Sequence, residues 1–275
     1  KRMRLYYSMF YNRILNNREN HVISRIHQKG RANVLFIASS LAMWKHQQLY
    51  ELLRTDKRFN PCIIICPFST YTIQDKTMNV NLLKDYFDSH NTPYHLYEND
   101  SCFALEEMHP DIIFYPQPYE NLFGNKLDFQ YYKDSLLCYC PYALYTVNME
   151  WVYNVKLQNR AWKLYYPTSF HLKDAQELMY NRGRNVVVSG YTNANLLMTK
   201  SRVKEDSSMK HIIWAPHFSI TSNSSMKRGA FLWLSDLMIK LAIEYKSRIM
   251  WTFKPHPRLK TELYKLQEWG KERTD

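Results

Sequence analysis

The chain has 275 residues, of which 45% are hydrophobic and 23% are charged, the composition of a globular protein rather than of a disordered or fibrous one. Its formal net charge is +12, but residues 1–31 hold eight lysines and arginines against one acid, Glu19, and so supply +7 of it. Because the excess is local, the composition argues against a nucleic-acid-binding protein. No apolar run approaches the ~18 residues of a membrane span, and we expect no signal peptide.

Glycine and cysteine usage narrows the class of protein further. Only six glycines occur, and the sequence contains neither G-x-G-x-x-G nor G-x-x-x-x-G-K-[ST], which argues against a dinucleotide-binding dehydrogenase and a P-loop enzyme. Four of the five cysteines sit in apolar, strand-like runs, so we expect buried, reduced thiols in a cytoplasmic protein. No group of histidines, cysteines and carboxylates has the spacing of a metal site, and we expect neither a metal nor a cofactor.

Residues 1–31 have the pattern of a basic, amphipathic helix. Tyr6, Phe10 and Ile14 are spaced by four, which places them on one helix face. Basic and aromatic residues together suit a helix that lies on an anionic membrane surface, here the inner face of the cell membrane. The alternative is a first helix packed on the flank of the domain with its charges in solvent. Both interpretations stay open.

Residues 32–200 alternate apolar, strand-like runs with helical segments. NVLFIASS at 33–40 and PCIIICP at 61–67 predict two buried strands, because continuous apolar runs suit strands covered on both faces. Further strands are predicted at 94–97, 110–115, 136–142, 163–166 and 185–189, and helices at 41–54 and 81–90. Strands that alternate with helices form βαβ units. We therefore expect an α/β fold with a Rossmann-like domain over 32–200.

A second domain is predicted beyond the polar stretch at 201–210, which lacks apolar periodicity. Apolar runs at 212–214 and 249–253 flank an amphipathic helix over 231–245, and together they predict a parallel, right-handed βαβ unit. One further helix is expected over 259–269. Because a self-sufficient α/β domain needs ~100 residues, we expect 201–275 to be an incomplete domain that continues beyond Asp275.

Each strand of this unit ends at a Pro-His pair, which supplies His217 and His256. Proline has no N–H and ends the ladder, so both histidines should leave neighbouring parallel strands at their carboxyl ends, where open α/β sheets bind ligands. Lys254 and Arg258 add positive charge and Ser219 adds a hydroxyl, which suits a phosphorylated ligand. The alternative is that each pair only ends a strand and opens a solvated turn.

The runs IIWAPHFSIT at 212–221 and FKPHPRLKTELYKLQEWGKERTD at 253–275, with the helix between them, resemble the CDP-glycerol glycerophosphotransferase family, two-domain GT-B enzymes of teichoic-acid and related surface-polymer synthesis. PDIIFYPQPYE at 110–120 and VVVSGYTNANLL at 186–197 fall in the order of that family's first domain. The resemblance covers about 32–275. It implies a GT-B-like fold in which 32–200 is the acceptor-side domain and 201–275 begins the donor-nucleotide domain.

The resemblance also implies roles for individual residues. His256, with Lys254 and Arg258, would face the donor phosphates, and His217 would lie beside the same pocket as a catalytic residue. The family's Trp-His-Gly segment, whose histidine is the proposed base, is missing here, and its Asp-Ser-Ser-type donor segment would lie beyond the last residue of the sequence. Glu120, at the end of YPQPYE, is the candidate base if His217 is not, although this run also fits a proline-braced surface turn.

Three functions fit these residues. The resemblance implies a transferase that moves glycerol phosphate from CDP-glycerol to a hydroxyl of a cell-surface polymer or its lipid-linked precursor, with CMP as the leaving group. A second hypothesis keeps the fold and uses a nucleotide sugar, which gives a glycosyltransferase of capsule or cell-wall polysaccharide. The third is a non-catalytic GT-B-like binding module that has lost its base. The partners expected for the enzymes are a nucleotide-activated donor and a polymer or lipid-linked acceptor.

Overall fold

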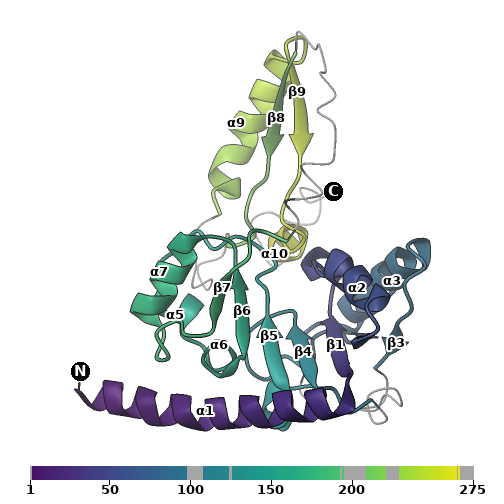
Figure 1. Cartoon of the computed structure of the whole chain (residues 1–275). Coiled ribbons are helices and arrows are strands. Elements are labelled where there is room, and N and C mark those ends of the chain that lie inside the picture. The colour runs from purple at the N-terminus through teal and green to yellow at the C-terminus, as the bar shows by residue number, and fades with distance from the viewer. Residues whose placement is uncertain are drawn as a thin grey trace. The chain divides into compact units, whose positions relative to one another are not determined.

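In the computed structural model the chain forms two compact units, Lys1–Lys200 and Ser201–Asp275 (Figure 1). The residues described are 2–97, 108–123, 126–192, 194, 209–220, 229–264 and 266, with side chains from Asn12 onward. Each unit has its own parallel sheet, so we treat the two units separately.

The first unit contains a seven-stranded sheet in the order β3-β2-β1-β4-β5-β6-β7, and every neighbouring pair in it is parallel. This confirms the predicted α/β class. The strands are β1 (Ala32–Ala38), β2 (Phe59–Ile65), β3 (His95–Leu96), β4 (Ile112–Tyr115), β5 (Leu136–Tyr139), β6 (Lys163–Tyr166) and β7 (Val186–Val188).

Both faces of this sheet carry helices, which is why its central strands read as continuous apolar runs. Within β1, Leu35 and Ile37 belong to one buried cluster, whereas Val34 and Phe36 belong to the other. The first cluster includes side chains of α5 (Glu150–Tyr153), α6 (Lys156–Arg160) and α7 (Ser169–Leu178), and the second includes side chains of α2 (Gln47–Thr55) and α3 (Ile73–Ser89). The two groups of helices therefore cover opposite faces.

Two helices begin at residues other than those predicted. Residues 41–43 form a short 3-10 helix, η1 (Leu41–Met43), and α2 begins only at Gln47, because Trp44 turns into the core and packs edge-on against Phe87 at 5.0 Å. Helix α3 begins at Ile73 rather than at 81. The Thr72 side chain accepts a hydrogen bond from the Asp75 N–H at 3.1 Å and so caps this earlier start. A second 3-10 helix, η2 (Phe129–Tyr131), precedes β5.

Helix α1 (Arg2–Lys29) runs along the amino ends of the strands in the first unit (Figure 1). Leu15 and Val22 are buried. The fully buried carboxylate of Asp111 accepts hydrogen bonds from Arg25 and Lys29 and from the Asn33 N–H, at 3.0–3.2 Å for the shortest of each. These contacts support the packed-flank interpretation for residues 12–29. The aromatic residues of the first turns lie outside the described side chains, so membrane contact stays a prediction.

The second unit contains the predicted βαβ arrangement. β8 (Lys210–Trp214) pairs in parallel with β9 (Ile249–Phe253), and α9 (Phe231–Glu244) connects them. Helix α10 (Leu259–Tyr264) follows β9. In the whole described chain, no helix is long and apolar enough to span a bilayer. Among the described residues, Cys62, Cys66, Cys138 and Cys140 form no disulfide bond, and Cys102 lies outside that part of the chain.

Replacing Asp111 by alanine should lower the free energy of unfolding of the first unit by about 2–3 kcal/mol, because it leaves Arg25 and Lys29 without their shared buried carboxylate. Urea unfolding of the full chain, followed by circular dichroism, measures the change. The matched control is Asp56→Ala, which breaks the exposed pair with Arg58 (2.6 Å) and should have little effect. Equal unfolding midpoints for Asp111→Ala and the unaltered chain would contradict the assigned role.

Candidate functional site

The ladder between β8 and β9 continues beyond the last strand residues and brings the two Pro-His turns together. The Lys254 N–H donates to the Trp214 carbonyl at 2.9 Å, and the His256 N–H donates to the Pro216 carbonyl at 3.0 Å. The imidazole rings of His217 and His256 consequently lie 5.5 Å apart between centroids, at an angle of 61°. The expectation that both histidines leave one edge of the sheet is confirmed.

Phe218 fixes the spacing of this cluster. Its ring lies 4.4 Å from the ring of His217 and 4.5 Å from the ring of His256. The Arg258 guanidinium carbon lies 4.4 Å from the centroid of the same ring, within the range of a cation–π contact. One aromatic side chain thus touches both imidazoles and the cation, and holds them on one surface.

Both imidazoles have the same hydrogen-bonding arrangement at Nδ1. The Ser219 N–H donates to Nδ1 of His217 at 3.2 Å, and the Arg258 N–H donates to Nδ1 of His256 at 3.1 Å. A nitrogen that accepts a hydrogen bond carries no proton, so this geometry assigns the proton of each neutral ring to Nε2. In this tautomer the Nε2 atom of each ring is a hydrogen-bond donor, which suits an anionic oxygen better than proton abstraction.

Ser219 is placed to orient His217. Its hydroxyl lies 2.8 Å from Nδ1 of His217, and the residue is only 2% exposed. In its burial Ser219 differs from Lys254 and Arg258, the exposed members of the predicted donor-phosphate site. Its geometry favours positioning the imidazole over a direct contact with phosphate.

Arg258 and Lys254 provide the positive charge of this edge. The Arg258 side chain is 62% exposed and forms a long ion pair with Glu262 at 3.4 Å, a weak contact for so exposed a group. Lys254 is exposed at the end of β9. Both cations are accessible to an anionic ligand from solvent.

The environment of His256 opposes its protonation. Burial lowers the pKa of the His256 imidazole below its usual value, and His217 and Arg258 lower this pKa further. The ring is therefore neutral at pH 7. An anion bound beside it would favour the protonated form and raise the pKa again.

Gly229 lies against the turn that carries His217. Its N–H donates to the Ser219 carbonyl at 3.1 Å. A Cβ at this position would lie 2.9 Å from the His217 carbonyl oxygen and 2.8 Å from Cγ2 of Ile220. The backbone can pass this closely only because the residue has no side chain.

Glu120, the other predicted catalytic residue, lies in the first unit, in the loop after β4. Its carboxylate forms an ion pair with Nζ of Lys156 at 2.8 Å, and this carboxylate raises the pKa of the lysine. The Glu120 side chain is about one-third exposed. Since Lys156 already pairs with Oε2 of this carboxylate, a role as a base would compete with the ion pair.

Sequence reasoning missed three buried polar residues that follow β1 along the chain. Ser39, Ser40 and His46 are each less than 5% exposed, and their side chains include atoms without a hydrogen-bond partner among the described residues. The two serines end the run NVLFIASS, and small polar residues after a buried parallel strand are the signal that could have identified this position.

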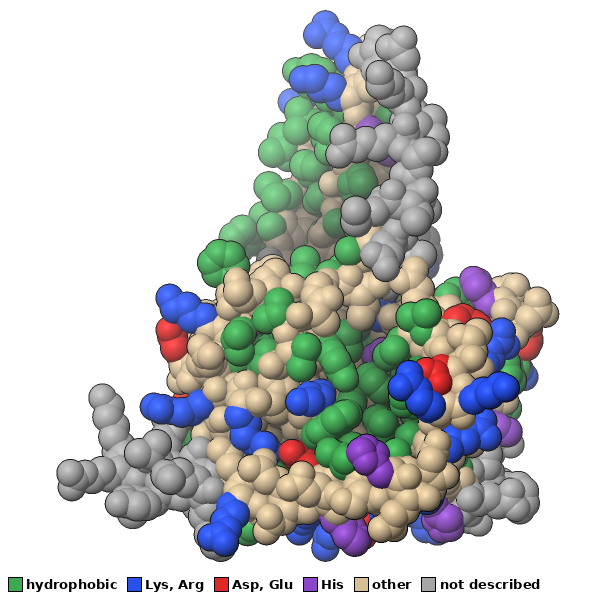
Figure 2. All heavy atoms as spheres, viewed as in Figure 1, with side chains coloured by type: hydrophobic (Ala, Val, Ile, Leu, Met, Phe, Trp, Pro, Cys, Tyr) green, Lys and Arg blue, Asp and Glu red, His purple; other side chains and the backbone are tan. Residues whose placement is uncertain are grey.

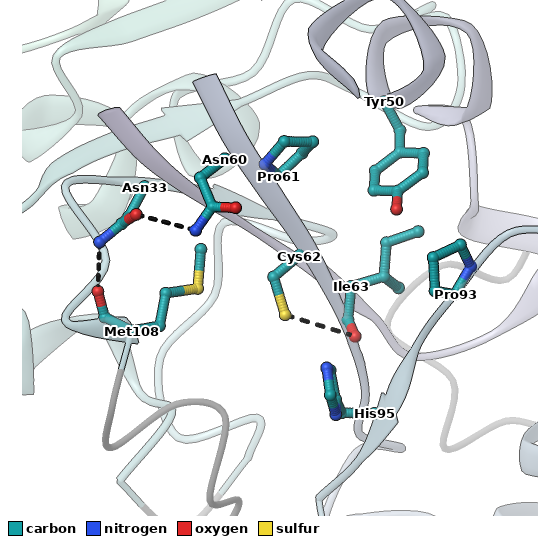
Figure 3. A pocket seen from close by; sticks show the side chains of 9 residues that line it. All are labelled: Asn33, Tyr50, Asn60, Pro61, Cys62, Ile63, Pro93, His95 and Met108. Carbon is teal, nitrogen blue, oxygen red and sulfur yellow. Dashed lines mark hydrogen bonds between the residues drawn. The ribbon is translucent and has the colours of Figure 1, made fainter. Parts of the chain in front are cut away.

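A hollow of about 470 Å³ opens elsewhere in the first unit, beside β2 (Figure 3). β3 pairs with Ile64 and Ile65 of β2, and among the described residues no strand pairs with this edge of β2 from Asn60 to Ile63. Pro61 occupies this edge, where a residue without an N–H leaves no donor unpaired. The Asn60 amide donates to the Asn33 side chain at 3.0 Å, and the Asn33 amide donates to a backbone carbonyl. We interpret this hollow as an open sheet edge. In the described part of the chain, no group of three metal-binding side chains occurs.

Comparison with solved structures shows the fold. The chain resembles a protein of Listeria monocytogenes described as a UDP-N-acetylglucosamine 2-epimerase, with a TM-score of 0.55 and 15% identity over 88% of this chain and 68% of that one. It resembles S. aureus MnaA, solved with UDP, with a TM-score of 0.55 and 12% identity over 86% and 66%. It also resembles UDP-GlcNAc 2-epimerase from Neisseria meningitidis, solved with UDP-GlcNAc, with a TM-score of 0.51 and 14% identity over 86% and 70%.

The likeness shows an α/β fold of the GT-B type, and the chain spans about two-thirds of the length of these structures. No protein-family model and no curated protein matches the sequence. The comparisons therefore bear out the GT-B part of the resemblance found in the sequence, whereas its link to CDP-glycerol has no support from them.

Replacing His217 by glutamine should raise the pKa of His256, because the change removes a neighbouring titratable ring that disfavours the imidazolium form. NMR titration of the His256 Hε1 signal between about pH 5 and 8 measures this pKa. His211→Gln is the matched control, since His211 bonds to Thr252 at 2.8 Å within the strands and should leave the pKa of His256 unchanged. A His256 pKa that falls, or does not move, in His217→Gln would show that the rings are not coupled.

Replacing Gly229 by alanine should displace the His217 turn, because the new Cβ would meet backbone oxygens at 3.0 Å or less. We expect the Hε1 NMR signals of His217 and His256 to shift, with the rest of the spectrum retained. Ala230→Ser, at the exposed neighbouring position, should leave both signals in place. If the His217 and His256 signals of Gly229→Ala are the same as those of the unaltered chain, the backbone does not approach as closely as the structure shows.

Proposed function

We propose that the chain binds a nucleotide-activated donor, in the first place a nucleoside diphosphate sugar, at the edge that holds His217 and His256. The observation that carries this proposal is the pair of imidazoles, 5.5 Å apart, beside the exposed Arg258 guanidinium. Diphosphate oxygens accept hydrogen bonds from such donors, and the bond from a guanidinium is charge-assisted. The likeness to S. aureus MnaA and to the N. meningitidis enzyme, which were solved with UDP and UDP-GlcNAc, supports a nucleotide sugar as the donor.

The reaction that fits best is glycosyl transfer from this donor to an acceptor hydroxyl. The bond between the sugar and the diphosphate breaks, and negative charge grows on the departing diphosphate. Arg258 and the two Nε2–H groups would stabilise that charge, which is the usual largest contribution of a protein to such a step. His217 is assigned a hydrogen-bonding role in this scheme rather than that of a base, because its Nδ1 already accepts the Ser219 N–H.

A CDP-glycerol glycerophosphotransferase is the second candidate. The observation in its favour is the sequence pattern A-P-H followed by K-P-H-P-R, whose histidines the structure brings to 5.5 Å of one another. The same cationic edge would hold the diphosphate of CDP-glycerol, and an acceptor hydroxyl would attack the glycerol-bearing phosphorus with CMP as the leaving group. The two candidates differ in donor and not in the residues that hold it.

The remaining residues predicted from the sequence have secondary roles in the proposal. Lys254 would add a second cation for the phosphates, and Ser219 would orient His217. Glu120 is kept as the candidate base of the first unit, provided that the acceptor displaces Lys156 from it. The acceptor is proposed to be a surface polysaccharide or its lipid-linked precursor.

Isothermal titration of the full chain with UDP, UDP-GlcNAc and CDP-glycerol tests the proposal. We expect saturable binding of UDP, and a loss of about 10–100-fold in affinity for Arg258→Ala and for His256→Ala, since each removes a hydrogen bond to a charged group. Lys240→Ala, at an exposed lysine of α9, is the control and should bind UDP as the unaltered chain does.

The outcomes separate the candidates. Binding of UDP and UDP-GlcNAc that depends on Arg258 supports a nucleotide-sugar enzyme, whereas binding of CDP-glycerol alone supports the glycerophosphotransferase. If Arg258→Ala and His256→Ala bind UDP as tightly as the unaltered chain does, the donor binds elsewhere and the proposal is wrong.

A further inference from the structure

Helix α1 carries two apolar stripes that lie on different sides of it. Successive residues of an α-helix are about 100° apart, so Leu15, Val22 and Ile26 share one side. Leu15 and Val22 are buried, and Ile26 packs against a core cluster of the first unit. The second stripe occupies the first four turns and consists of Met3, Tyr6, Phe10 and Ile14. It lies about 130° further round the helix, so the side that holds α1 on the sheet is not the side that carries these residues.

The side of the second stripe is turned to solvent along the part of α1 whose side chains are described. Ile14, the last member of the stripe, is 38% exposed. The same side continues along the helix through four exposed polar residues, Asn17, His21, Ser24 and Gln28. In Figure 1 the first turns of α1 extend past the last strand of the sheet. The stripe is therefore a surface that a partner outside the first unit can contact.

The charge around this stripe is positive. Residues 1–18 contain no acid and five cations, Lys1, Arg2, Arg4, Arg13 and Arg18. Glu19, the one acid of the helix, pairs with Arg184 at 3.1 Å. Arg13 and Arg18 are exposed, and neither forms an ion pair within the part of the chain that the structure describes. Figure 2 shows Lys, Arg and His side chains along the lower edge of this unit, where α1 lies in Figure 1. Charge complementarity therefore calls for an anionic partner.

An apolar stripe between two rows of cations fits the surface of an anionic bilayer. Helical spacing places Arg2 and Arg13 on one flank of the stripe and Arg18 on the other. Such long side chains keep their charge at the level of the lipid phosphates while apolar neighbours enter the bilayer. Tyrosine, as at position 6, is enriched at the boundary between water and acyl chains. A second copy of the chain fits less well, because pairing two such stripes would bring like charges together without an acid between them.

We propose that α1 docks the chain on an anionic lipid bilayer, with the second stripe at the depth of the headgroups and the flanking arginines on lipid phosphates. The helix would lie in the plane of the bilayer. Its other side would stay on the first unit, where Arg25 and Lys29 are engaged with the buried carboxylate of Asp111 and are not offered to lipid. This inference goes beyond the proposed function and does not depend on the donor site.

Flotation of the full chain with lipid vesicles tests this proposal. The two vesicle types are phosphatidylcholine alone and phosphatidylcholine with about one-third phosphatidylglycerol, which differ in surface charge. We expect binding to the anionic vesicles to be about tenfold stronger or more, because each basic residue near such a surface contributes roughly fivefold. Arg2→Glu with Arg13→Glu should lower the affinity for anionic vesicles at least about 25-fold. Tyr6→Ser with Phe10→Ser, which removes apolar area from the stripe, should lower it about tenfold or more.

Lys240→Glu with Lys246→Glu is the matched control, since it reverses two exposed lysines of the second unit and changes the net charge by the same amount. It should leave vesicle binding unchanged, and circular dichroism verifies that each variant is folded. The proposal is overturned if the chain does not prefer anionic vesicles, or if either double variant of α1 binds them as the unaltered chain does. It is also overturned if the chain is a dimer that Tyr6→Ser with Phe10→Ser converts to monomers, because the stripe would then be an interface between copies.

Discussion

The candidate donor site depends on the parallel register of β8 and β9. Trp214 pairs with Phe253, and the ladder continues through the hydrogen bonds that Lys254 and His256 donate to carbonyls of the neighbouring strand. A shift of this register by one residue would turn every side chain to the opposite face of the sheet. The two imidazoles therefore meet because of backbone pairing, before any attraction between their side chains is considered.

The hydrogen bonds within each turn then decide what these imidazoles can do. In each case the backbone N–H two residues further along donates to Nδ1, which places the proton of the neutral ring on Nε2. Phe218 and Arg258 complete a surface of donors and positive charge around them. Such a surface binds a diphosphate through fixed donors. A base would require the opposite tautomer, so the geometry shifts the interpretation of His217 from proton abstraction to ligand binding.

The features that the sequence predicts well are those that depend on neighbouring residues. The continuous apolar run of β1 and the βαβ unit around α9 follow from local pattern alone. The capped start of α3 was also encoded locally, in Thr72 and Asp75, but its polar first turns hide it from a search for apolar periodicity. Helices α5 and α6 have only four and five residues, too few to show helical periodicity in the sequence.

Other features depend on contacts between residues far apart in the chain, and the sequence does not reveal them. Asp111 anchors α1 through Arg25 and Lys29, which precede it by more than 80 positions. Likewise, the pairing of Glu120 with Lys156 and the aromatic surroundings of His46 appear only once the strands are arranged. A residue type suggests a chemical role, but its partners decide whether that role is available.

Topology also explains how the helices of the first unit divide between the two faces of its sheet. The connections β1–β2–β3 move along the sheet in one direction, and those of β4–β5–β6–β7 move in the other. Right-handed crossovers in opposite directions place their helices on opposite faces, as the clusters around α2 and α3 and around α5, α6 and α7 show. The face over β4, β5 and β6 on the α2 side thus receives none of these helices.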